Sequence, residues 1–477
     1  MLLAIDQGTT GTTCLVVDDE LRPIGRGYRE INQHFPQPGW VEHDPEEIWE
    51  SVLAAAGDAL AHAGVFASDL AALGITNQRE TTVVWDRRTG RPLQRAIVWQ
   101  DRRTAERCRE LPRDLIRERT GLLPDPYFSA TKLEWILRHT ERSQADLAFG
   151  TVDSWLVWKL TAGAAHVSDE TNASRTLLLG LDARDWDDEL LSLFRIERTL
   201  LPKVVPSSGL VGHGELLGAE VPIAGIAGDQ QAALFGQGCF SAGEAKVTYG
   251  TGSFVLINAG SGRTGTPDGL LETAAAVAPG APPQLAVEGS VLVAGAAVQW
   301  LRDGLGLIAD VREAEALALE VDSSEGVVFV PALTGLGSPH WDPDARGLVA
   351  GITRGTTRAH LVRATLEAIA FQVADVVDAY PGDIGVLRAD GGASANGFLM
   401  QFQADLLGCP VEVAADAEMT ALGTAALAGL AVGMWPDVDA LRGRIRRGAR
   451  YEPAMSRDEA AERRSAWRDA LRRTLSS

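Results

Sequence analysis

A strand, a turn rich in Gly and Thr, and a returning strand occur twice in this chain, and the repetition limits the folds that the sequence can adopt. In the first copy, two short apolar runs flank the Gly and Thr residues of 8–13. In the second copy, strands predicted for residues 245–249 and 253–258 flank Gly250-Thr251-Gly252. This weak internal repeat predicts two related domains that face one another across a cleft.

The first turn has the chemistry of a phosphate-binding hairpin. Glycine lets the backbone approach a ligand closely, and the N–H and hydroxyl groups of a Gly/Thr turn can cradle phosphate oxygens. Asp6 ends the first strand, where it can hold a magnesium ion or a water bound to one. The alternative is an ordinary surface hairpin, which this segment by itself fits equally well.

The order of the remaining patterns favours a layered α/β fold. Strand patterns occur at several places, among them residues 24–33, 71–76, 81–85 and 385–389. A helix is expected to begin at Pro45, with Asp44 as its N-cap and Glu47 closing a capping box. A long apolar helix pattern covers residues 358–380. Strands and helices that alternate in this way are typical of α/β layers rather than of a helical bundle or a β-sandwich.

Size and charge bound the function. The chain has 477 residues, a length that predicts roughly two to three domains. Its net charge of −20 argues against nucleic acid or a membrane surface as a partner, because both are anionic. ATP is still possible as a substrate of this acidic chain, since magnesium and local donors can offset the charge of ATP. The arginines within residues 442–450 are expected to form a solvated face.

The sequence favours a cytoplasmic protein without disulfides. The cysteines, which show no CxxC spacing, are Cys14, Cys108, Cys239 and Cys409. We expect buried thiols rather than disulfides or a zinc site. Asp6 interrupts the N-terminal apolar run before the core of a secretory signal could form. The run Ala421–Trp435 falls short of the roughly 18 apolar residues that a membrane span needs, so a buried helix is expected there.

Three further features suit a cleft that binds a polyol. Asp229 follows an apolar run, and a carboxylate at a strand end can accept a hydroxyl proton, although it could also cap the next helix. The adjacent Arg79 and Glu80 supply the donors and acceptors that a polyol needs, although such couples are most often surface ion pairs. Trp99 and Phe254 could form an apolar wall against the carbon chain, although each is individually more often part of a core.

Eight sequence blocks, spread over nearly the whole chain, carry a resemblance to a known family. They are Asp6–Thr10, Pro38–Pro45, Gly74–Thr82, Trp99–Thr104, Asp125–Ser129, Gly228–Gly236, Tyr249–Gly252 and Asp390–Gly392. Together they resemble the FGGY family of carbohydrate kinases and, within it, the glycerol branch. The hairpin and the Gly-Asp-Gln block recur across the larger family, whereas Asn77–Thr82 and Asp125–Ser129 are more particular to the glycerol branch.

The resemblance implies an α/β fold of two actin-like domains, each with a ribonuclease-H-like core. Residues 1–238 would carry the glycerol site and the first phosphate hairpin, and residues 239–477 would bind the nucleotide. The implied reaction is the ATP- and Mg²⁺-dependent phosphorylation of glycerol to sn-glycerol 3-phosphate in glycerol catabolism. The resemblance also implies a homo-oligomer, a dimer or a tetramer.

The same resemblance assigns roles to single residues. Asp229 would be the base, and Asp6 would help to place magnesium. The residues implied to bind glycerol are Arg79, Glu80, Trp99, Tyr127, Asp229, Gln230 and Phe254. The residues implied to contact the nucleotide are Thr9, Thr10, Gly11, Thr251, Gly295, Gln299, Gly392 and Asn396.

Two alternatives and one departure stay open. The chain could be a kinase of the same family for another polyol or sugar, such as erythritol, xylulose or gluconate. It could also be a non-catalytic actin-like module that binds ATP. Gly11 and Thr13 stand where many family members carry Ser and Arg, which removes a hydroxyl and a positive charge near the phosphates.

We predict that fructose 1,6-bisphosphate does not inhibit the purified protein. Residues 215–220 are short and acidic, where some bacterial members have a longer basic loop that binds this inhibitor. A bisphosphate would therefore meet no cation in this loop. The measurement is glycerol phosphorylation with the effector at millimolar concentration, and inhibition would refute the prediction.

Overall fold

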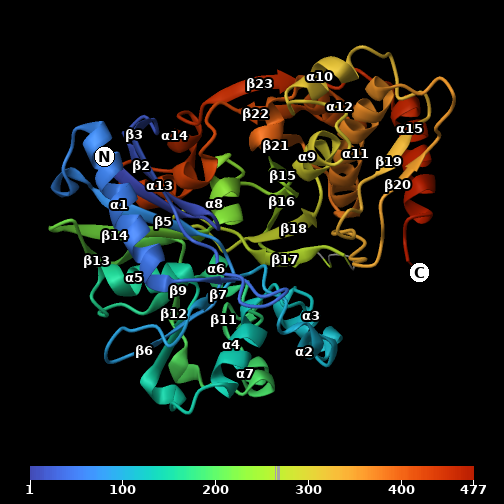
Figure 1. Cartoon of the computed structure of the whole chain (residues 1–477). Helices are drawn as coiled ribbons and strands as arrows, with labels where there is room; N and C mark the ends of the chain where they lie inside the picture. Colours follow the sequence, from blue (N-terminus) through green and yellow to red (C-terminus); the bar gives the residue numbers. More distant parts are fainter. Residues whose placement is uncertain (264, 266–268, 477) are drawn as a thin grey trace. The chain divides into compact units, whose positions relative to one another are not determined.

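Two large mixed β-sheets organise the chain (Figure 1). The computed structural model describes residues 1–263, 265 and 269–476. Its contacts divide the chain into two units. Unit 1 comprises Met1–Phe240, Glu272–Ala286 and Glu418–Ile445, and unit 2 comprises Ser241–Leu271, Val287–Ala417 and Arg446–Ser477. The α/β class expected from the sequence is confirmed.

The sheet of unit 1 brings three strand ends to one edge. Its strands, in the order β13-β14-β5-β1-β2-β3, are β13 (Ser208–Leu216), β14 (Ala219–Gly228), β5 (Ala72–Asn77), β1 (Leu2–Gln7), β2 (Gly11–Val17) and β3 (Pro23–Glu30). The hairpin β1–β2 is the one that the sequence predicts. Both β1 and β14 run parallel to β5, and Asn77 pairs with Gln7 on one side and Gly228 on the other. The residues that follow these three positions therefore leave the sheet at the same edge.

Helix α1 (Pro45–Ala63) packs on β2 and β3. Asp44 is its N-cap, and one carboxylate oxygen accepts the Glu46 N–H at 2.9 Å. The predicted capping box is wrong, because Glu47 Oε1 accepts from the backbone and side-chain N–H groups of Asn32 instead. Glu47 thus joins the start of the helix to Asn32, which follows β3. Local helix rules do not predict this partner.

Helix α13 (Met419–Ala431) belongs to unit 1 although it lies late in the chain. Figure 1 shows it, in red, beside the blue strands β2 and β5. A Cβ atom on Gly74 of β5 would lie 2.4 Å from the Thr424 carbonyl oxygen, and one on Gly225 of β14 would lie 2.8 Å from it. Glycine at both positions lets the helix and the strands approach this closely. The buried helix expected for Ala421–Trp435 is confirmed as far as Ala431, where α13 ends.

The packing of α13 bears on how the chain is divided. Residues 272–286 and 418–445 group with unit 1 by their contacts, whereas the sequence assigns both to a C-terminal domain. The division into domains 1–238 and 239–477 stays a prediction. Connectivity along the chain could not reveal the two returning segments, because packing places them.

The second large sheet contains the repeated hairpin. Its strands, in the order β17-β18-β16-β15-β21-β22-β23, are β17 (Leu271–Ala274), β18 (Leu285–Val291), β16 (Ser253–Gly260), β15 (Glu244–Tyr249), β21 (Val386–Asp390), β22 (Val411–Ala414) and β23 (Arg447–Tyr451). The long helix predicted for residues 358–380 is α11 (Arg358–Ala379). Its buried Ile369 and Val373 share an apolar core with Val247 and Val255 of the hairpin.

The remaining α-helices and β-strands belong to both units. In unit 1 they are β4 (Glu42–His43), β6 (Val83–Asp86), β7 (Ala96–Ile97), α2 (Ala105–Arg109), α3 (Arg113–Thr120), α4 (Ser129–Arg138), β8 (Leu147–Gly150), α5 (Val152–Leu160), β9 (Val167–Asp169), α6 (Glu170–Ala173), β10 (Leu179–Gly180), β11 (Asp185–Trp186), α7 (Asp188–Phe194), β12 (Lys203–Val205), α8 (Asp229–Gly236) and α14 (Val438–Arg442). In unit 2 they are α9 (Gly295–Asp303), α10 (Glu313–Ala318), β19 (Val328–Val330), β20 (Leu348–Ala350), α12 (Gly397–Leu407) and α15 (Arg457–Arg472). The four cysteines are buried thiols, as expected. Over the described part of the chain, no helix combines the length and the apolar character needed to cross a membrane.

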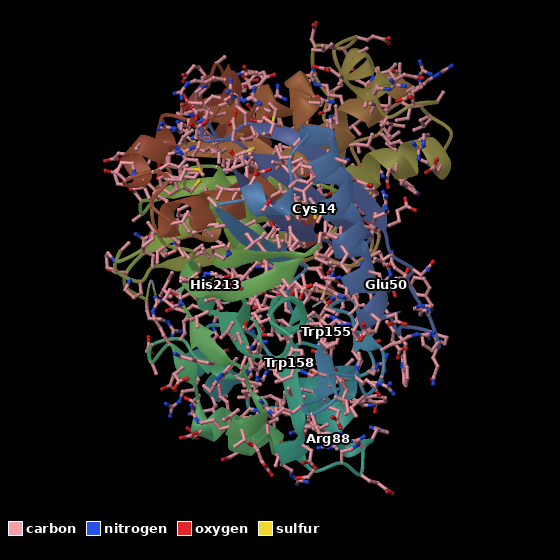
Figure 2. The ribbon with its side chains drawn as sticks, turned by 90° about the vertical axis from the view of Figure 1, so that its left-hand side faces the viewer. Cys14, Glu50, Arg88, Trp155, Trp158 and His213 are labelled. Atoms are coloured by element: carbon pink, nitrogen blue, oxygen red, sulfur yellow. The ribbon has the colours of Figure 1, made fainter. Side chains whose placement is uncertain are left out.

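A cluster of aromatic rings fills the core around β6 and α5, where Figure 2 labels Trp155 and Trp158. The Trp85 ring lies 5.3 Å from Trp155 and 5.6 Å from Trp158 between centroids, and the His166 ring meets it edge-on at 5.4 Å. His166 Nε2 lies 2.8 Å from the Phe149 carbonyl oxygen, so this nitrogen carries the proton and donates it. Burial lowers the pKa of His166 to about 4.

We predict that His166→Gln reduces the loss of stability on acidification. The unfolded chain binds a proton at the ordinary His pKa of 6.5, whereas folded His166 does so only near pH 4. Its contribution is therefore complete above pH 6.5 and is lost as the pH falls toward 4, by about 3 kcal/mol at most. Gln keeps a donor for Phe149 but does not titrate. Urea unfolding at roughly pH 7 and pH 5, followed by Trp fluorescence, measures the change.

The matched control for this measurement is His62→Gln, because His62 is exposed on α1. We expect this variant to keep the pH dependence of the natural chain. An equal pH dependence in His166→Gln and in the natural chain would show that His166 does not carry the effect.

Candidate active site

The edge of the unit 1 sheet brings together four residues that the sequence singles out. Asp6 lies near the end of β1, Arg79 and Glu80 follow β5, and Asp229 follows β14. Because the three strands are parallel neighbours, residues from distant parts of the chain meet where the strands end. The roles of these residues stay predictions, and their contacts define a candidate site.

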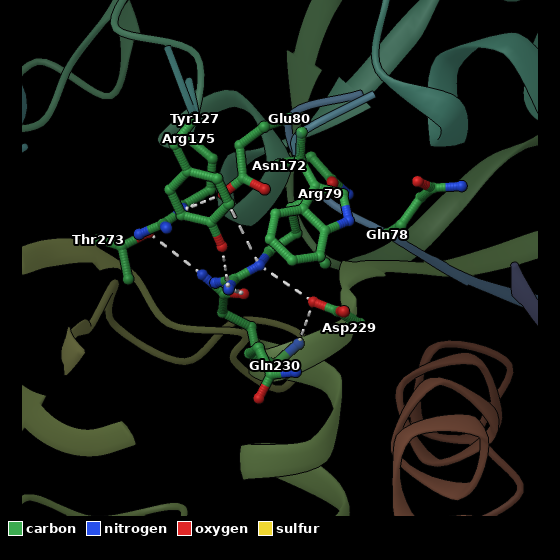
Figure 3. A network of polar contacts seen from close by, with 12 residues as sticks. Gln78, Arg79, Glu80, Tyr127, Asn172, Arg175, Asp229, Gln230 and Thr273 are labelled. Carbon is green, nitrogen blue, oxygen red and sulfur yellow. Dashed lines mark hydrogen bonds and ion pairs between the residues drawn. The ribbon is translucent and has the colours of Figure 1, made fainter. Parts of the chain in front are cut away.

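Arg79 is the centre of a polar network (Figure 3). Its side chain is 2% exposed, and Nε lies 3.0 Å from Asp229 Oδ1 and 3.9 Å from Glu80 Oε1. Nη1 donates to Gln231 Oε1 at 3.2 Å, and Nη2 donates to the Tyr127 hydroxyl at 3.4 Å. The surface ion pair considered for Arg79 and Glu80 is wrong, since both side chains are buried.

Glu80 is held in a backbone conformation that side chains rarely adopt. Its φ is 61°, in the left-handed region. The Glu80 carbonyl oxygen accepts from Ser129 Oγ at 3.0 Å and from Thr82 Oγ1 at 3.1 Å. Its carboxylate lies 2.6 Å from Arg175 Nε. Backbone strain that is maintained by surrounding contacts is common at functional sites.

Trp99 and Tyr127 form an aromatic wall beside the network. Their ring centroids are 5.5 Å apart in an edge-on arrangement. The Trp99 backbone N–H donates to Thr81 Oγ1 at 3.3 Å, and its indole Nε1 donates to Thr9 Oγ1 at 2.9 Å. Thr9 lies in the turn between β1 and β2, so Trp99 joins the aromatic wall to the candidate phosphate hairpin.

Asp229 is accessible at the start of a helix. It is the first residue of α8, and Gly228 is the N-cap, so the sequence alternative in which Asp229 caps the helix is wrong. Asp229 Oδ1 accepts the Gln230 N–H at 2.7 Å. Its side chain is 31% exposed while Arg79 beside it is buried. The arrangement holds the carboxylate in place and leaves it open to a substrate.

Asp6 lies among other carboxylates. Burial raises the pKa of Asp6 to about 8, and the negative charges of Asp229 and Glu418 add to the shift. A divalent cation would favour the ionised form of Asp6. In residues 1–263, 265 and 269–476 no three His, Cys, Asp or Glu side chains gather into a ready-made metal site. Asp6 and the carboxylates near it fit Mg²⁺, which commonly uses one or two carboxylates together with phosphate and water.

Gln78 fixes the turn between β1 and β2. Its Nε2 donates to Gln7 Oε1 at 3.0 Å and to the Gly8 carbonyl oxygen at 3.3 Å. The Gly8 N–H donates to the Gly11 carbonyl oxygen at 2.9 Å and closes the turn. A Cβ atom on Gly11 would lie 2.5 Å from the Arg29 carbonyl oxygen, so the packing of β2 on β3 requires glycine here. The hydroxyl missing from Gly11 thus has a structural reason.

In unit 2, the second Gly/Thr turn is bonded to the start of α9. The Gly295 N–H donates to the Gly250 carbonyl oxygen at 3.0 Å. A Cβ atom on Gly295 would lie 2.6 Å from the same oxygen, which explains a glycine at this helix start. Thr251 and Gln299 are exposed. The structure therefore brings Thr251 and Gly295, both expected to contact the nucleotide, to one place.

A second turn of unit 2 lies against the same strand end. A Cβ atom on Gly391 would lie 2.4 Å from the Tyr249 carbonyl oxygen, which puts Gly391 and the exposed Gly392 beside the end of β15. Asn396 caps α12 by accepting a backbone N–H at 2.9 Å. Phe254 is half-buried on β16. The cap gives Asn396 a structural role whether or not it contacts a nucleotide.

The sequence patterns do not reveal the importance of the segment after β9. Asp169 caps α6 by accepting the N–H groups of Thr171 and Asn172. Thr171 Oγ1 also accepts the Gly228 N–H at 2.8 Å, and the side-chain amides of Asn172 and Asn77 exchange hydrogen bonds at 3.1 Å. These bonds join the ends of β14 and β5. Asp169 could have been recognised from the sequence as a helix cap. The partners of Thr171 and Asn172 could not, because they lie 57 and 95 residues away in the chain.

Lys132 is a second contributor that the sequence did not indicate. It is fully buried on α4. Its ammonium donates to the carbonyl oxygens of Pro126, Tyr127 and Phe128 at 3.0, 2.6 and 2.9 Å. Burial lowers the pKa of Lys132 to about 8. This side chain fixes the backbone that carries Tyr127.

Comparison with known proteins identifies the family. The N-terminal domain of the FGGY family of carbohydrate kinases matches residues 1–236, and its C-terminal domain matches residues 245–432. The chain belongs to this family. A glycerol kinase of Citrifermentans bemidjiense is 53% identical over 99% of this chain and 98% of its own length. Glycerol kinase 2 of Thermotoga maritima is 51% identical over 99% of this chain and 98% of its own length.

Solved structures share the fold. The glycerol kinase of Plasmodium falciparum, crystallised with ADP, has a TM-score of 0.95 at 36% identity and covers 100% of this chain and 98% of its own. A "xyloylose kinase" of Brucella ovis has a TM-score of 0.87 at 26% identity and covers 99% of this chain and 97% of its own. The two-domain, actin-like α/β fold that the resemblance implies is confirmed.

We predict that Trp99→Phe raises the KM for ATP more than the KM for glycerol. Phe keeps an aromatic wall beside Tyr127 but loses the indole N–H that donates to Thr9. Thr9 is one of the residues expected to contact the nucleotide. A neutral hydrogen bond contributes about 0.5–1.5 kcal/mol, so the KM for ATP should rise roughly twofold to tenfold. Steady-state kinetics with each substrate varied in turn measures both values.

A double-mutant cycle separates this bond from other effects of the two positions. If the bond carries the effect, Thr9→Val should change the KM for ATP less in the Trp99→Phe background than in the natural chain. Equal changes in both backgrounds, or a rise in the KM for glycerol alone, would contradict the assignment.

Proposed function

We propose that this chain transfers the γ-phosphoryl group of ATP to a terminal hydroxyl of glycerol, giving sn-glycerol 3-phosphate and ADP. The observation that carries the proposal is the network around Arg79, in which buried donors and acceptors stand beside an aromatic wall. Full-length relatives that are glycerol kinases support it. A small polyol needs this combination of hydrogen-bonding groups and apolar surface.

In this proposal the side chains of unit 1 orient the polyol. The carboxylates of Glu80 and Asp229 accept hydrogen bonds from hydroxyl groups, and the guanidinium of Arg79 donates them. Gln230 and Tyr127 supply further polar contacts, and Trp99 supports the carbon chain. Orientation matters because phosphoryl transfer depends mainly on positioning and on charge stabilisation.

Asp229 is the base of the proposed reaction. Its carboxylate accepts the proton of the terminal hydroxyl while the hydroxyl oxygen attacks the γ-phosphorus and the bond to ADP breaks. Asp6 would hold Mg²⁺, which neutralises charge on the phosphates. The proposed nucleotide contacts are Thr9, Thr10 and Gly11 in unit 1, and Thr251, Gly295, Gln299, Gly392 and Asn396 in unit 2.

A substrate panel tests the proposed function. ADP release is measured with glycerol, erythritol, xylulose and gluconate at matched concentrations, and the phosphorylated products are identified. We expect the highest kcat/KM with glycerol. A higher value with another polyol or sugar would reassign the substrate within the family. ATP turnover without any phosphorylated product would instead favour a non-catalytic ATP-binding module.

We predict that Asp229→Asn lowers kcat by about a hundredfold or more and leaves glycerol binding largely intact. Asn keeps an oxygen that Arg79 can contact, but it cannot take up the hydroxyl proton. Steady-state kinetics gives kcat, and calorimetry gives the glycerol affinity. The control Asp114→Asn, at an exposed position of α3, should leave both unchanged. Near-normal turnover in Asp229→Asn would remove Asp229 as the base.

A further inference from the structure

Arg175 touches two of the residues proposed to bind glycerol, although no sequence motif pointed to it. Its Nε donates to Glu80 Oε1 at 2.6 Å, and its guanidinium carbon lies 5.3 Å from the centre of the Tyr127 ring. Figure 3 shows Arg175 beside both residues. The Arg175 side chain is 0% exposed, so it can act on a bound polyol only through its neighbours.

The contact with Glu80 fixes a buried charge. The Glu80 side chain is 1% exposed, and a buried carboxylate is strongly disfavoured unless it is paired. Arg79 Nε lies nearer to Asp229, at 3.0 Å, than to Glu80, at 3.9 Å. Of the two guanidinium groups, Arg175 is therefore the closer partner of Glu80. A charge-assisted hydrogen bond of this length also sets the direction of the carboxylate.

The contact with Tyr127 supports an aromatic ring. Arg175 approaches the ring within the range of a cation–π interaction, and Trp99 meets the same ring edge-on. The Tyr127 hydroxyl accepts from Arg79 Nη2 at 3.4 Å. Arg175, Trp99 and Arg79 thus each contact the Tyr127 side chain. Arg175 also pairs with Glu80 at 2.6 Å, closer than Arg79 at 3.9 Å.

The segment that carries Arg175 is itself restrained. The neighbouring Ser174 Oγ lies 2.6 Å from Thr273 Oγ1 and accepts the Ala274 N–H at 3.1 Å. On the other side, Thr176 Oγ1 donates to the Ala173 carbonyl oxygen at 2.7 Å. The backbone that carries Arg175 is therefore fixed. A side chain that positions other side chains needs such a fixed backbone.

We propose that Arg175 is a positioning residue for the polyol: through Glu80 and Tyr127 it sets the affinity for glycerol without contacting it. This inference rests on the proposed function. The contacts of Arg175 described above are with Glu80 and Tyr127, whereas the chemical step depends on Asp229 and the phosphates. Loss of Arg175 should therefore act on the KM for glycerol far more than on kcat or on the KM for ATP.

The test compares Arg175→Gln and Arg175→Lys by steady-state kinetics. We expect Arg175→Gln to raise the KM for glycerol about thirtyfold or more, since a buried carboxylate loses its charged partner, and to change kcat less than about threefold. Arg175→Lys keeps the charge but loses the planar guanidinium, so its KM should rise only about fivefold. This partial recovery by Lys distinguishes positioning from general damage. If Arg175→Gln fails to fold, the KM and kcat of Arg175→Lys still test the inference.

Arg103 offers a matched control. It is also a buried arginine, with a side chain 1% exposed, and it pairs with Asp101 at 2.8 Å and stacks on Trp40 at 3.7 Å. Because these contacts do not involve Glu80 or Tyr127, Arg103→Lys should change the KM for glycerol less than about twofold. An unchanged KM in Arg175→Lys, or kcat falling in proportion to the rise in KM, would overturn the inference.

A double-mutant cycle with Glu80→Gln tests the route of the effect. If Arg175 acts mainly through Glu80, Arg175→Lys should raise the KM for glycerol much less in the Glu80→Gln background. Equal effects in both backgrounds would refute that route. If the natural enzyme prefers another polyol, the proposed function fails, and the same variants are compared with the preferred polyol, which still decides the role of Arg175.

Discussion

Two buried arginines balance two carboxylates where the parallel strands β5 and β14 end, and the candidate site depends on this balance. Arg79 lies between Asp229 and Glu80, and Arg175 pairs with the same Glu80 oxygen at a shorter distance. Removing one member would leave a neighbour charged in a poorly solvated place. The network presents a polyol with acceptors and donors in fixed positions. These groups become ordered when the chain folds, so substrate binding does not have to order them.

The phosphate hairpin is joined to the same edge of the sheet by side chains. Gln78, next to Arg79, bonds to the turn of the hairpin, and Trp99, next in space to Tyr127, bonds to Thr9. The groups that would hold phosphate and those that would hold the polyol thus share supports. Phosphoryl transfer requires the attacking oxygen and the phosphorus to be held in line, and shared supports serve this requirement.

Much of the fold follows from local patterns. Alternation and turn chemistry predict β1–β2 and β15–β16, and apolar periodicity predicts α11 and the buried α13, because these signals depend on residues close in sequence. The candidate residues were found through motifs, and the structure brings those of unit 1 together at one edge. The capping box at Glu47 failed because Asn32, a partner outside the helix, takes its carboxylate. The sequence also did not predict that residues 272–286 and 418–445 group with unit 1. Their place depends on packing rather than on their order in the chain.

The sequence by itself determined the family, the two Gly/Thr hairpins and the chemical types of side chain available for binding and catalysis, since each is written in short stretches. Only the tertiary structure decided that Arg79 and Glu80 form a buried pair rather than a surface one, and that Arg175 and Lys132 support them. These facts depend on which distant segments meet. The partners of Arg175 and Asn172 lie 95 residues away in the chain, and contacts over such separations are set by the packing of the whole unit rather than by any local pattern.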